Sequence, residues 1–172
     1  MNTNDKSIGY ITANFSEKEK EEIIRWSKSI KDKDLHLTLV DGKIEGGNVT
    51  GDLHLTLFYG LDENKINQRE LKDFLGTIDL GILDIGEMDV FSLPDQEYKV
   101  LYLPVKDTRG SINRCRERLK ELSYFTEYQK FEFKPHITIA FVKSEFDMHD
   151  INYTGPKVLH VEKITHHIKN ST

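Results

Sequence analysis

Two short segments, Leu53–Phe58 and Pro135–Phe141, each contain a His-x-Thr motif inside an apolar run. Successive side chains of a β-strand point to opposite faces, so the histidine and the threonine of each motif would share one face. The other face would take the apolar residues Leu53, Leu55, Leu57, Ile137, Ile139 and Phe141. Each strand can therefore bury one face and present an imidazole and a hydroxyl on the other. Two such strands predict one shared binding pocket.

The two histidines, His54 and His136, can divide the work of phosphodiester cleavage between them. One neutral imidazole takes a proton from the attacking hydroxyl, and one imidazolium protonates the leaving oxygen. The hydroxyls of Thr56 and Thr138 can donate hydrogen bonds to the phosphate oxygens as negative charge develops there. This chemistry requires no metal, and the motifs predict no cofactor.

The chain has 172 residues, enough to bury a core without disulfides, and we expect one domain over residues 1–172. Its net charge of -5 offers no general attraction to nucleic acid, which argues against a long duplex as a ligand. Cys115 is the only cysteine, and its helical spacing indicates a packed thiol. The polar N-terminus has no apolar stretch typical of a signal peptide, and no later run is long enough for a membrane span. We therefore expect a cytoplasmic protein, in the host cytoplasm if it is viral.

The apolar periodicity predicts alternating strands and helices. Strands are expected over residues 8–15, 35–40, 53–59, 85–91, 100–105, 133–142 and 158–168, and helices after Ser16, over 64–75 and around Ile112, Cys115, Leu119 and Leu122. Asp41 and Gly42 are a hairpin signal in a glycine-rich connection, and residues 42–51 are a candidate lid. Each half of the chain combines a strand, a helix and a His-x-Thr strand, so the halves resemble variations on one unit. Such a duplication would bring the two histidines face to face across a cleft.

The segments Leu53–Gly60 and Lys134–Ala140 resemble the paired signatures of the two-histidine (2H) phosphoesterases. That family includes 2′-5′ RNA ligase-like proteins, 2′,3′-cyclic nucleotide phosphodiesterases, viral 2′-5′ oligoadenylate phosphodiesterases and phage anti-CBASS nucleases. The resemblance implies an α+β fold that is bilobal and pseudo-two-fold, with two antiparallel sheets forming a central cleft flanked by helices. It also implies that His54 and His136 are the catalytic acid and base and that their threonines bind phosphate.

A third segment, Leu35–Leu39, repeats the first motif almost letter for letter and offers His36 as an alternative to His54. We prefer His54 because the tail Phe58–Gly60, followed by a polar helix, resembles the usual continuation in the family. Residues 40–43, by contrast, are typical of a hairpin turn. If His36 were the true site, alanine at His54 would leave activity largely intact.

Residues around the cleft must set the specificity. Tyr10, Tyr59 and either Phe91 or Tyr98 could stack on bases, with core packing as the alternative for each. Lys134, directly before the second motif, could hold a phosphate or remain solvated.

The remaining candidates lie near the C-terminus. By resemblance to the phage nucleases, in which a late acidic residue reads the base, Glu162 is a candidate base contact. The pair His166–His167 is predicted to be a solvated terminus rather than a metal site, and His149 and His160 are expected at the surface.

These features lead to one hypothesis with two alternatives. The first is a metal-independent phosphodiesterase, expected as a monomer, that cleaves small cyclic or 2′-5′-linked oligonucleotides, including host immune signals if the enzyme is from a phage. The second is RNA-end processing, by opening 2′,3′-cyclic phosphates or joining 2′-5′ ends. The third is a protein without catalytic activity that binds and sequesters a nucleotide.

Overall fold

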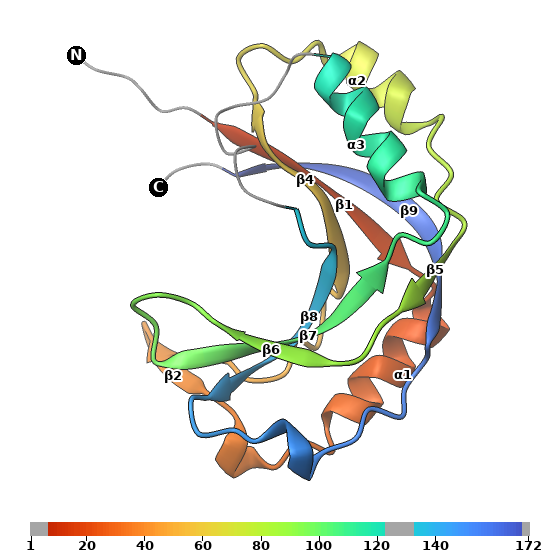
Figure 1. The fold of residues 1–172 in the computed structure, drawn as a ribbon. Coiled ribbons are helices and arrows are strands. Elements are labelled where there is room, and N and C mark those ends of the chain that lie inside the picture. Colours follow the sequence, from red (N-terminus) through yellow and green to blue (C-terminus); the bar gives the residue numbers. More distant parts are fainter. Residues whose placement is uncertain (1–6, 123–132, 170–172) are drawn as a thin grey trace, which may run out of the picture.

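The computed structural model describes residues 7–122 and 133–169, and within them the fold is mostly antiparallel β-structure with three α-helices (Figure 1). The strands are β1 (Ile8–Phe15), β2 (Leu37–Val40), β3 (Lys43–Gly46), β4 (His54–Asp62), β5 (Ile82–Ile85), β6 (Asp89–Ser92), β7 (Tyr98–Lys106), β8 (His136–Lys143) and β9 (Val158–Lys169). The helices are α1 (Glu17–Ser27), α2 (Gln68–Leu75) and α3 (Ser111–Glu121), with short 3-10 turns at Asp32–Asp34 and Met148–Asp150.

Most predicted elements are present, and the differences have local causes. The strand expected over 85–91 is interrupted between β5 and β6, although both pieces pair with β7. Helix α2 starts four residues later than expected, because Asp62 accepts hydrogen bonds from the following turn and Asn67 caps the helix. The glycine-rich connection contains β3, which forms a hairpin with β2; Asp41 and Gly42 at its tip both have positive φ, as a two-residue turn of this kind requires.

Seven strands form one connected sheet in the order β4-β1-β9-β5-β7-β6, with β8 paired to β7. The two separate antiparallel sheets that the resemblance implies are not clearly shown, because strands of both halves belong to this one sheet. Strand β9 pairs with β1 over most of its length and with β5 at its N-terminal end, so hydrogen bonds continue from one half to the other. The sheet is strongly curved, and the helices lie on its outer side (Figure 1).

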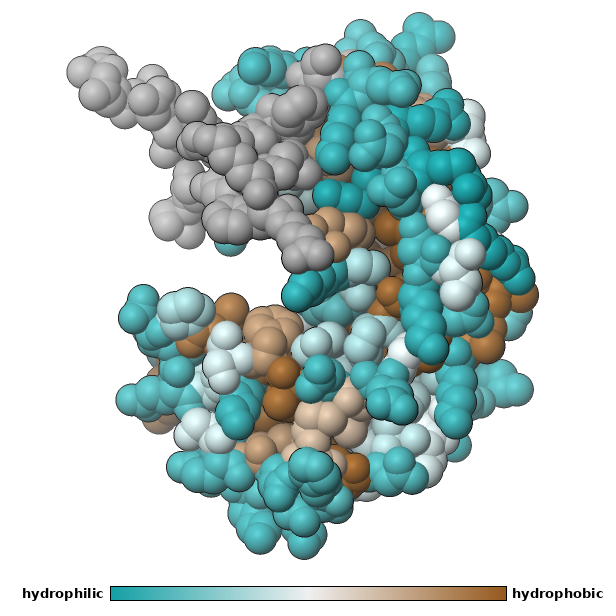
Figure 2. Space-filling view, in the orientation of Figure 1, coloured by the Kyte–Doolittle hydropathy of each residue, from teal (hydrophilic) through white to brown (hydrophobic). Residues whose placement is uncertain are grey.

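Helix α1, which follows β1, and helix α3, which follows β7, each pack against a strand of the other half. Helix α1 contacts β8, and α3 contacts β4, so each helix covers the His-x-Thr strand of the other half. The apolar faces of β4 and β8 form the core beneath these helices, including Leu55, Leu57 and Ile137 with no exposed surface. Figure 2 shows that the surface is hollowed at its left, between the part that contains α2 and α3 and the part that contains β6.

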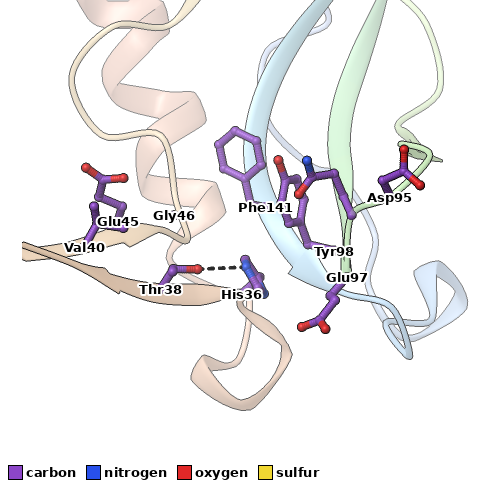
Figure 3. A pocket seen from close by; sticks show the side chains of 10 residues that line it. His36, Thr38, Val40, Glu45, Gly46, Asp95, Glu97, Tyr98 and Phe141 are labelled. Atoms are coloured by element: carbon purple, nitrogen blue, oxygen red, sulfur yellow. Dashed lines mark hydrogen bonds between the residues drawn. The ribbon is translucent and has the colours of Figure 1, made fainter.

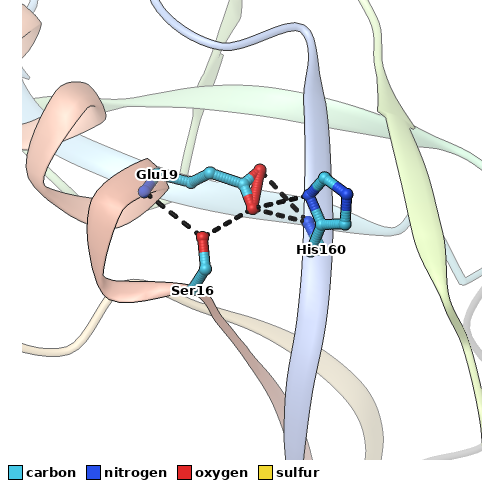
Figure 4. A network of polar contacts seen from close by, with 3 residues as sticks. All are labelled: Ser16, Glu19 and His160. Atoms are coloured by element: carbon cyan, nitrogen blue, oxygen red, sulfur yellow. Dashed lines mark hydrogen bonds and ion pairs between the residues drawn. The ribbon is translucent and has the colours of Figure 1, made fainter.

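A capping network attaches α1 to the last strand (Figure 4). The Ser16 hydroxyl accepts a hydrogen bond from the Glu19 backbone and donates one to the Glu19 carboxylate. That carboxylate also accepts hydrogen bonds from the backbone N–H and the Nδ1 of His160, at 2.8 and 3.0 Å. The predicted helix start is therefore confirmed, and the cap additionally joins α1 to β9. No helix in the described part of the chain is long and apolar enough to cross a membrane.

Candidate active site

Each His-x-Thr motif lies at the start of a strand, with its two polar side chains on the face away from the core. His54 and Thr56 of β4 are partly exposed, and so are His136 and Thr138 of β8, whereas the leucine or isoleucine between each pair is fully buried. The predicted alternation of these motifs is therefore confirmed. Strands β4 and β8 also contact each other, with Cα atoms within 8 Å, so both motifs belong to one region of the molecule.

The two imidazoles are held in the same way. Nδ1 of His54 lies 3.0 Å from the carbonyl oxygen of Asp52, and Nδ1 of His136 lies 2.8 Å from that of Lys134, in each case two residues earlier. A carbonyl can only accept a hydrogen bond, so each Nδ1 carries a proton. The other ring nitrogen, Nε2, is then an acceptor in the neutral ring and a donor in the charged ring. Both histidines can therefore exchange a proton through Nε2.

The threonine hydroxyls beside these rings have no hydrogen-bond partner within residues 7–122 and 133–169. Thr56 pairs in register with Thr12 of β1, which in turn pairs with Thr165 of β9. Neighbouring strands are about 4.8 Å apart, so these residues form a row of hydroxyls across three strands. A parallel row runs from His54 through Asn14 to Lys163. The first half thus presents a polar face that suits an anionic group.

Sequence reasoning missed these additional polar residues on β1 and β9. The available signal was the two-residue period of Tyr10, Thr12 and Asn14, and of Lys163, Thr165 and His167.

An aromatic cluster continues this face beyond the threonine row. Tyr10 stacks on His167 with ring centres 4.8 Å apart, and its ring lies 6.0 Å from that of Tyr59. Nε2 of His167 is also 2.9 Å from the hydroxyl of Thr12. His166, on the opposite face, pairs with Glu63 at 2.6 Å. The prediction that His166 and His167 belong to a solvated terminus is therefore wrong for both residues. The structure brings Tyr10 and Tyr59 to the same face as His54 and Thr56.

Around His136 the surroundings are aromatic. The rings of Phe91 and Tyr102 approach the imidazole edge-on, at 5.8 and 5.6 Å between ring centres. Burial, followed by the charge and hydrogen bond of Asp89, raises the pKa of Tyr102, so its phenol stays protonated at neutral pH. The rings of Phe91 and Tyr102 therefore enclose His136 on the side of β6 and β7.

One prediction about these strands is wrong in detail. Phe141 was expected on the core face, but it is partly exposed and lies on the face of His136. The reason is a β-bulge: Leu101 pairs with Ala140 and Tyr102 with Thr138, which leaves Ile139 as an extra residue. The alternation therefore shifts by one after the threonine.

Strand β4 has a bulge at the equivalent position. Ile11 pairs with Phe58 and Thr12 with Thr56, so Leu57 is the extra residue. Tyr59 is thereby turned to the histidine face, as Phe141 is in β8. Both strands thus place an aromatic ring five residues after the histidine.

A buried arginine of α3 supports both strands from behind. Nη1 of Arg116 donates to the carbonyl oxygen of Leu57 at 2.6 Å, at the bulge of β4. Its guanidinium also lies 3.6 Å from the centre of the Phe133 ring, three residues before His136. Burial lowers the pKa of Arg116 from its ordinary value. Arg116 therefore contacts both the first His-x-Thr strand and the segment just before the second one.

The other predicted residues lie at different places. Lys134 is exposed, and its carbonyl orients His136. Glu162 is the extra residue of a bulge in β9, since Asn14 pairs with Lys163 and Phe15 with Val161, and it lines a cavity beneath α2. Within residues 7–122 and 133–169, Glu162 has no hydrogen bond, ion pair or ring contact with His54 or His136.

The alternative motif differs from the other two. Nε2 of His36 lies 2.9 Å from the hydroxyl of Thr38, within its own motif, and its ring lies 4.8 Å from that of Tyr98. In His36 the Nε2 atom contacts Thr38, whereas Nε2 of His54 and of His136 has no partner among the described residues. Residues 7–122 and 133–169 hold no group of three or more His, Cys, Asp or Glu side chains arranged to bind a metal ion.

No protein-family model matches the sequence, and no curated protein is significantly similar to it. The fold, by contrast, resembles solved structures. A crystal structure of a phosphoesterase gives a TM-score of 0.57 at 20% identity and covers 94% of this chain and 88% of that chain. Crystal structures of E. coli LigT complexed with phosphate and with 3′-AMP both give a TM-score of 0.56 at 16% identity. They cover 96% and 97% of this chain and 88% and 90% of their own. The chain therefore has a LigT-like fold.

Proposed function

We propose that this protein is a nucleotide phosphodiesterase in which His54 and His136 are the general acid and base. The observation that carries the proposal is the matched support of the two imidazoles, each with Nδ1 on the carbonyl oxygen two residues earlier. Both rings offer Nε2 on the face of β4 and β8 that points away from the helices, and these two strands contact each other, as proton transfer at one phosphate requires. The LigT-like fold agrees with this assignment.

In the proposed reaction one histidine accepts the proton of the attacking hydroxyl, either a ribose 2′-OH or water. The new P–O bond forms as the bond to the leaving oxygen breaks. The other histidine donates its proton to that oxygen, so charge and protons balance over the step. Thr56 and Thr138 donate hydrogen bonds to the non-bridging oxygens of the phosphate. The exposed side chain of Lys134, two residues before His136, helps to hold the same phosphate.

The proposed substrates are small cyclic or 2′-5′-linked oligonucleotides, including signalling nucleotides of antiviral defence. In this proposal the two halves form lobes about a pseudo-two-fold axis, and the substrate binds in the cleft between them. The cluster Tyr10, Tyr59 and His167 would stack on a base beside the first motif. Structures of LigT complexed with phosphate and 3′-AMP support a nucleotide ligand for this fold.

The deciding experiment incubates wild-type protein and the His54→Ala/His136→Ala variant with a panel of nucleotides, followed by mass spectrometry. The panel contains cyclic dinucleotides, cyclic trinucleotides, 2′-5′ oligoadenylate, 2′,3′-cyclic mononucleotides and a tRNA fragment. We expect cleavage by the wild type alone, and unchanged rates after EDTA treatment. Circular dichroism of both proteins controls for folding.

The possible outcomes distinguish the hypotheses. Activity on the RNA fragment alone would favour RNA-end processing. Tight binding of a nucleotide that is recovered intact would contradict the enzyme and favour a sequestering protein. Equal cleavage by both proteins would overturn the two-histidine mechanism.

A further inference from the structure

The third His-x-Thr motif lines a cavity of about 620 Å³ that the proposed mechanism does not use (Figure 3). One wall is the β2–β3 hairpin, which contributes Thr38 and Glu45, with His36 directly before it. The opposite wall is formed by Tyr98 of β7 and Phe141 of β8. We call this cavity the hairpin pocket. The hairpin is held over the sheet by hydrogen bonds between the backbones of His36 and Gly47 and that of Phe141.

The hairpin pocket has aromatic walls. The rings of His36 and Tyr98 lie 4.8 Å apart with 31° between their planes, and Tyr98 meets Phe141 edge-on at 5.6 Å. In Figure 3 the Phe141 and Tyr98 side chains lie between the hairpin and β7. Such walls suit a flat aromatic group, because stacking and edge contacts between rings are favourable.

The charge of the hairpin pocket excludes a phosphate. Its lining contains the carboxylates Glu45, Asp95 and Glu97 together with the amide of Gln96, and none of the described residues that line it is lysine or arginine. A phosphate would be repelled, whereas a neutral ring bearing amino groups would find hydrogen-bond acceptors. A nucleobase has these properties.

The location connects the hairpin pocket to the proposed reaction. Phe141 shares a face with His136 and lies five residues farther along the strand, a distance of about 16 Å. This distance is too long for the base of the nucleotide whose own phosphate is beside His136. It suits the base of a neighbouring nucleotide. The first half has an equivalent aromatic cluster, since Tyr59 follows His54 by five residues and lies near Tyr10.

We propose that the hairpin pocket is a second base subsite, and that the substrate therefore contains at least two nucleotides. This inference rests on the proposed function, which supplies the phosphate site. It deepens that function by assigning a recognition role to His36, Thr38, Tyr98 and Phe141.

The test measures binding in the inactive His54→Ala/His136→Ala protein, so that no ligand is consumed. The ligands are 2′-5′-linked and 3′-5′-linked adenosine dinucleotides and, for comparison, AMP. The pocket variant adds His36→Ala/Thr38→Ala on the inner face of the hairpin. The matched control adds Leu39→Ala/Ile44→Ala, two residues of the same hairpin that are 72% exposed.

We expect the pocket variant to raise the Kd of a dinucleotide by about tenfold relative to that of AMP, in line with the stacking of one base. The control should leave this ratio unchanged. Equal weakening for dinucleotide and AMP, no weakening by the pocket variant, or no dinucleotide binding at all would overturn the inference. Because no cleavage is measured, failure of the enzyme hypothesis would appear separately, as inactivity of the wild type in the nucleotide panel.

Discussion

The two His-x-Thr strands, β4 and β8, have the same backbone design in different surroundings. In both, the histidine rests on the carbonyl oxygen two residues earlier, a bulge follows the threonine, and an aromatic ring returns to the histidine face. Around His54 the neighbours are polar, with the Asp52 carboxylate at 3.6 Å from Nδ1 and Asn14 on the adjoining strand. Around His136 they are the rings of Phe91 and Tyr102.

Strands β4 and β8 share the backbone around the histidine and differ in the side chains around it. In the proposed mechanism, the shared backbone design would orient both imidazoles for proton transfer, and the different surroundings would distinguish the two ends of a substrate. Among the described residues no carbonyl oxygen supports His36 in this way, and its Nε2 is engaged by Thr38, although the sequence of the motif is nearly identical. The supporting backbone, rather than the three letters of the motif, therefore indicates a catalytic role.

The largest effect is expected when each histidine is removed separately, which tests whether β4 and β8 contribute equally to catalysis. We expect His54→Ala and His136→Ala each to lower kcat by about 10²- to 10⁴-fold, since each loses one proton-transfer group. The wild-type rate should have a bell-shaped pH profile, because one ring must be neutral and the other charged. Each variant should lose one limb of that profile, as measured by initial rates.

His149→Ala is the matched control, since His149 is exposed and contacts Asp147 only within its own turn. A large loss in one histidine variant and a small loss in the other would show that the two strands are not equivalent. Normal activity in His54→Ala would reopen the alternative at His36.

Substitutions of Thr56 and Thr138 test whether β4 and β8 contribute equally to binding the phosphate. Thr56→Val and Thr138→Val keep the branched shape that favours a strand but remove the hydroxyl. We expect each to lower kcat by about ten- to a hundredfold, with serine variants restoring most of the activity. Steady-state kinetics on the substrate identified by mass spectrometry gives the measurement. Unequal losses would identify the strand that holds the more charged oxygen, whereas no loss from either would remove the threonines from the mechanism.

Arg116 tests whether the two strands share one support. Arg116→Met removes a charged hydrogen bond to β4 and the contact with Phe133, and we expect it to lower the free energy of unfolding by about 1.5–3 kcal/mol. Urea denaturation measures the change. Arg118→Met is the control, since Arg118 is exposed and lies over Phe74 at 4.9 Å. Equal effects of the two substitutions would contradict a special role for Arg116.

The smallest effect concerns Cys115, beside Arg116 on α3. Burial raises the pKa of this thiol to about 11, above its value in the unfolded chain. The thiol's contribution to stability is therefore fully present below about pH 8.5 and is lost as pH rises toward 11. We expect urea denaturation to show a smaller loss of stability between pH 8 and pH 10.5 in Cys115→Ala than in the wild type. Identical pH dependence in the two proteins would contradict this assignment.

Much of this architecture could be predicted from the sequence, because apolar periodicity and caps act locally. The strand starting at Ile8, the Ser16 cap and the buried faces of both motifs follow from neighbouring residues alone. The bulges could not be predicted, because an extra residue is defined only by its partner strand. The position of Phe141 was therefore assigned to the wrong face.

Contacts between residues far apart in the sequence could not be predicted either. The join of the two halves through β9, the Arg116 bond to β4 and the hairpin pocket depend on residues far apart in sequence. For His36 the sequence alone could not reveal that Nε2 is engaged. The first three features depend on tertiary contacts that no local pattern encodes, and the His36 contact depends on a side-chain conformation that the motif alone does not fix.

The place of β9 in the sheet has a consequence for biosynthesis. This strand, the last of the chain, lies between β1, the first, and β5. All residues from β1 to β9 must therefore leave the ribosome before the first strand gains its second neighbour. Pairing between such distant segments is slow, because loop closure costs entropy before any contact forms. During translation β1 and β4 would remain a pair in which the edge of β1 that later binds β9 is still unpaired, and chaperones could bind there.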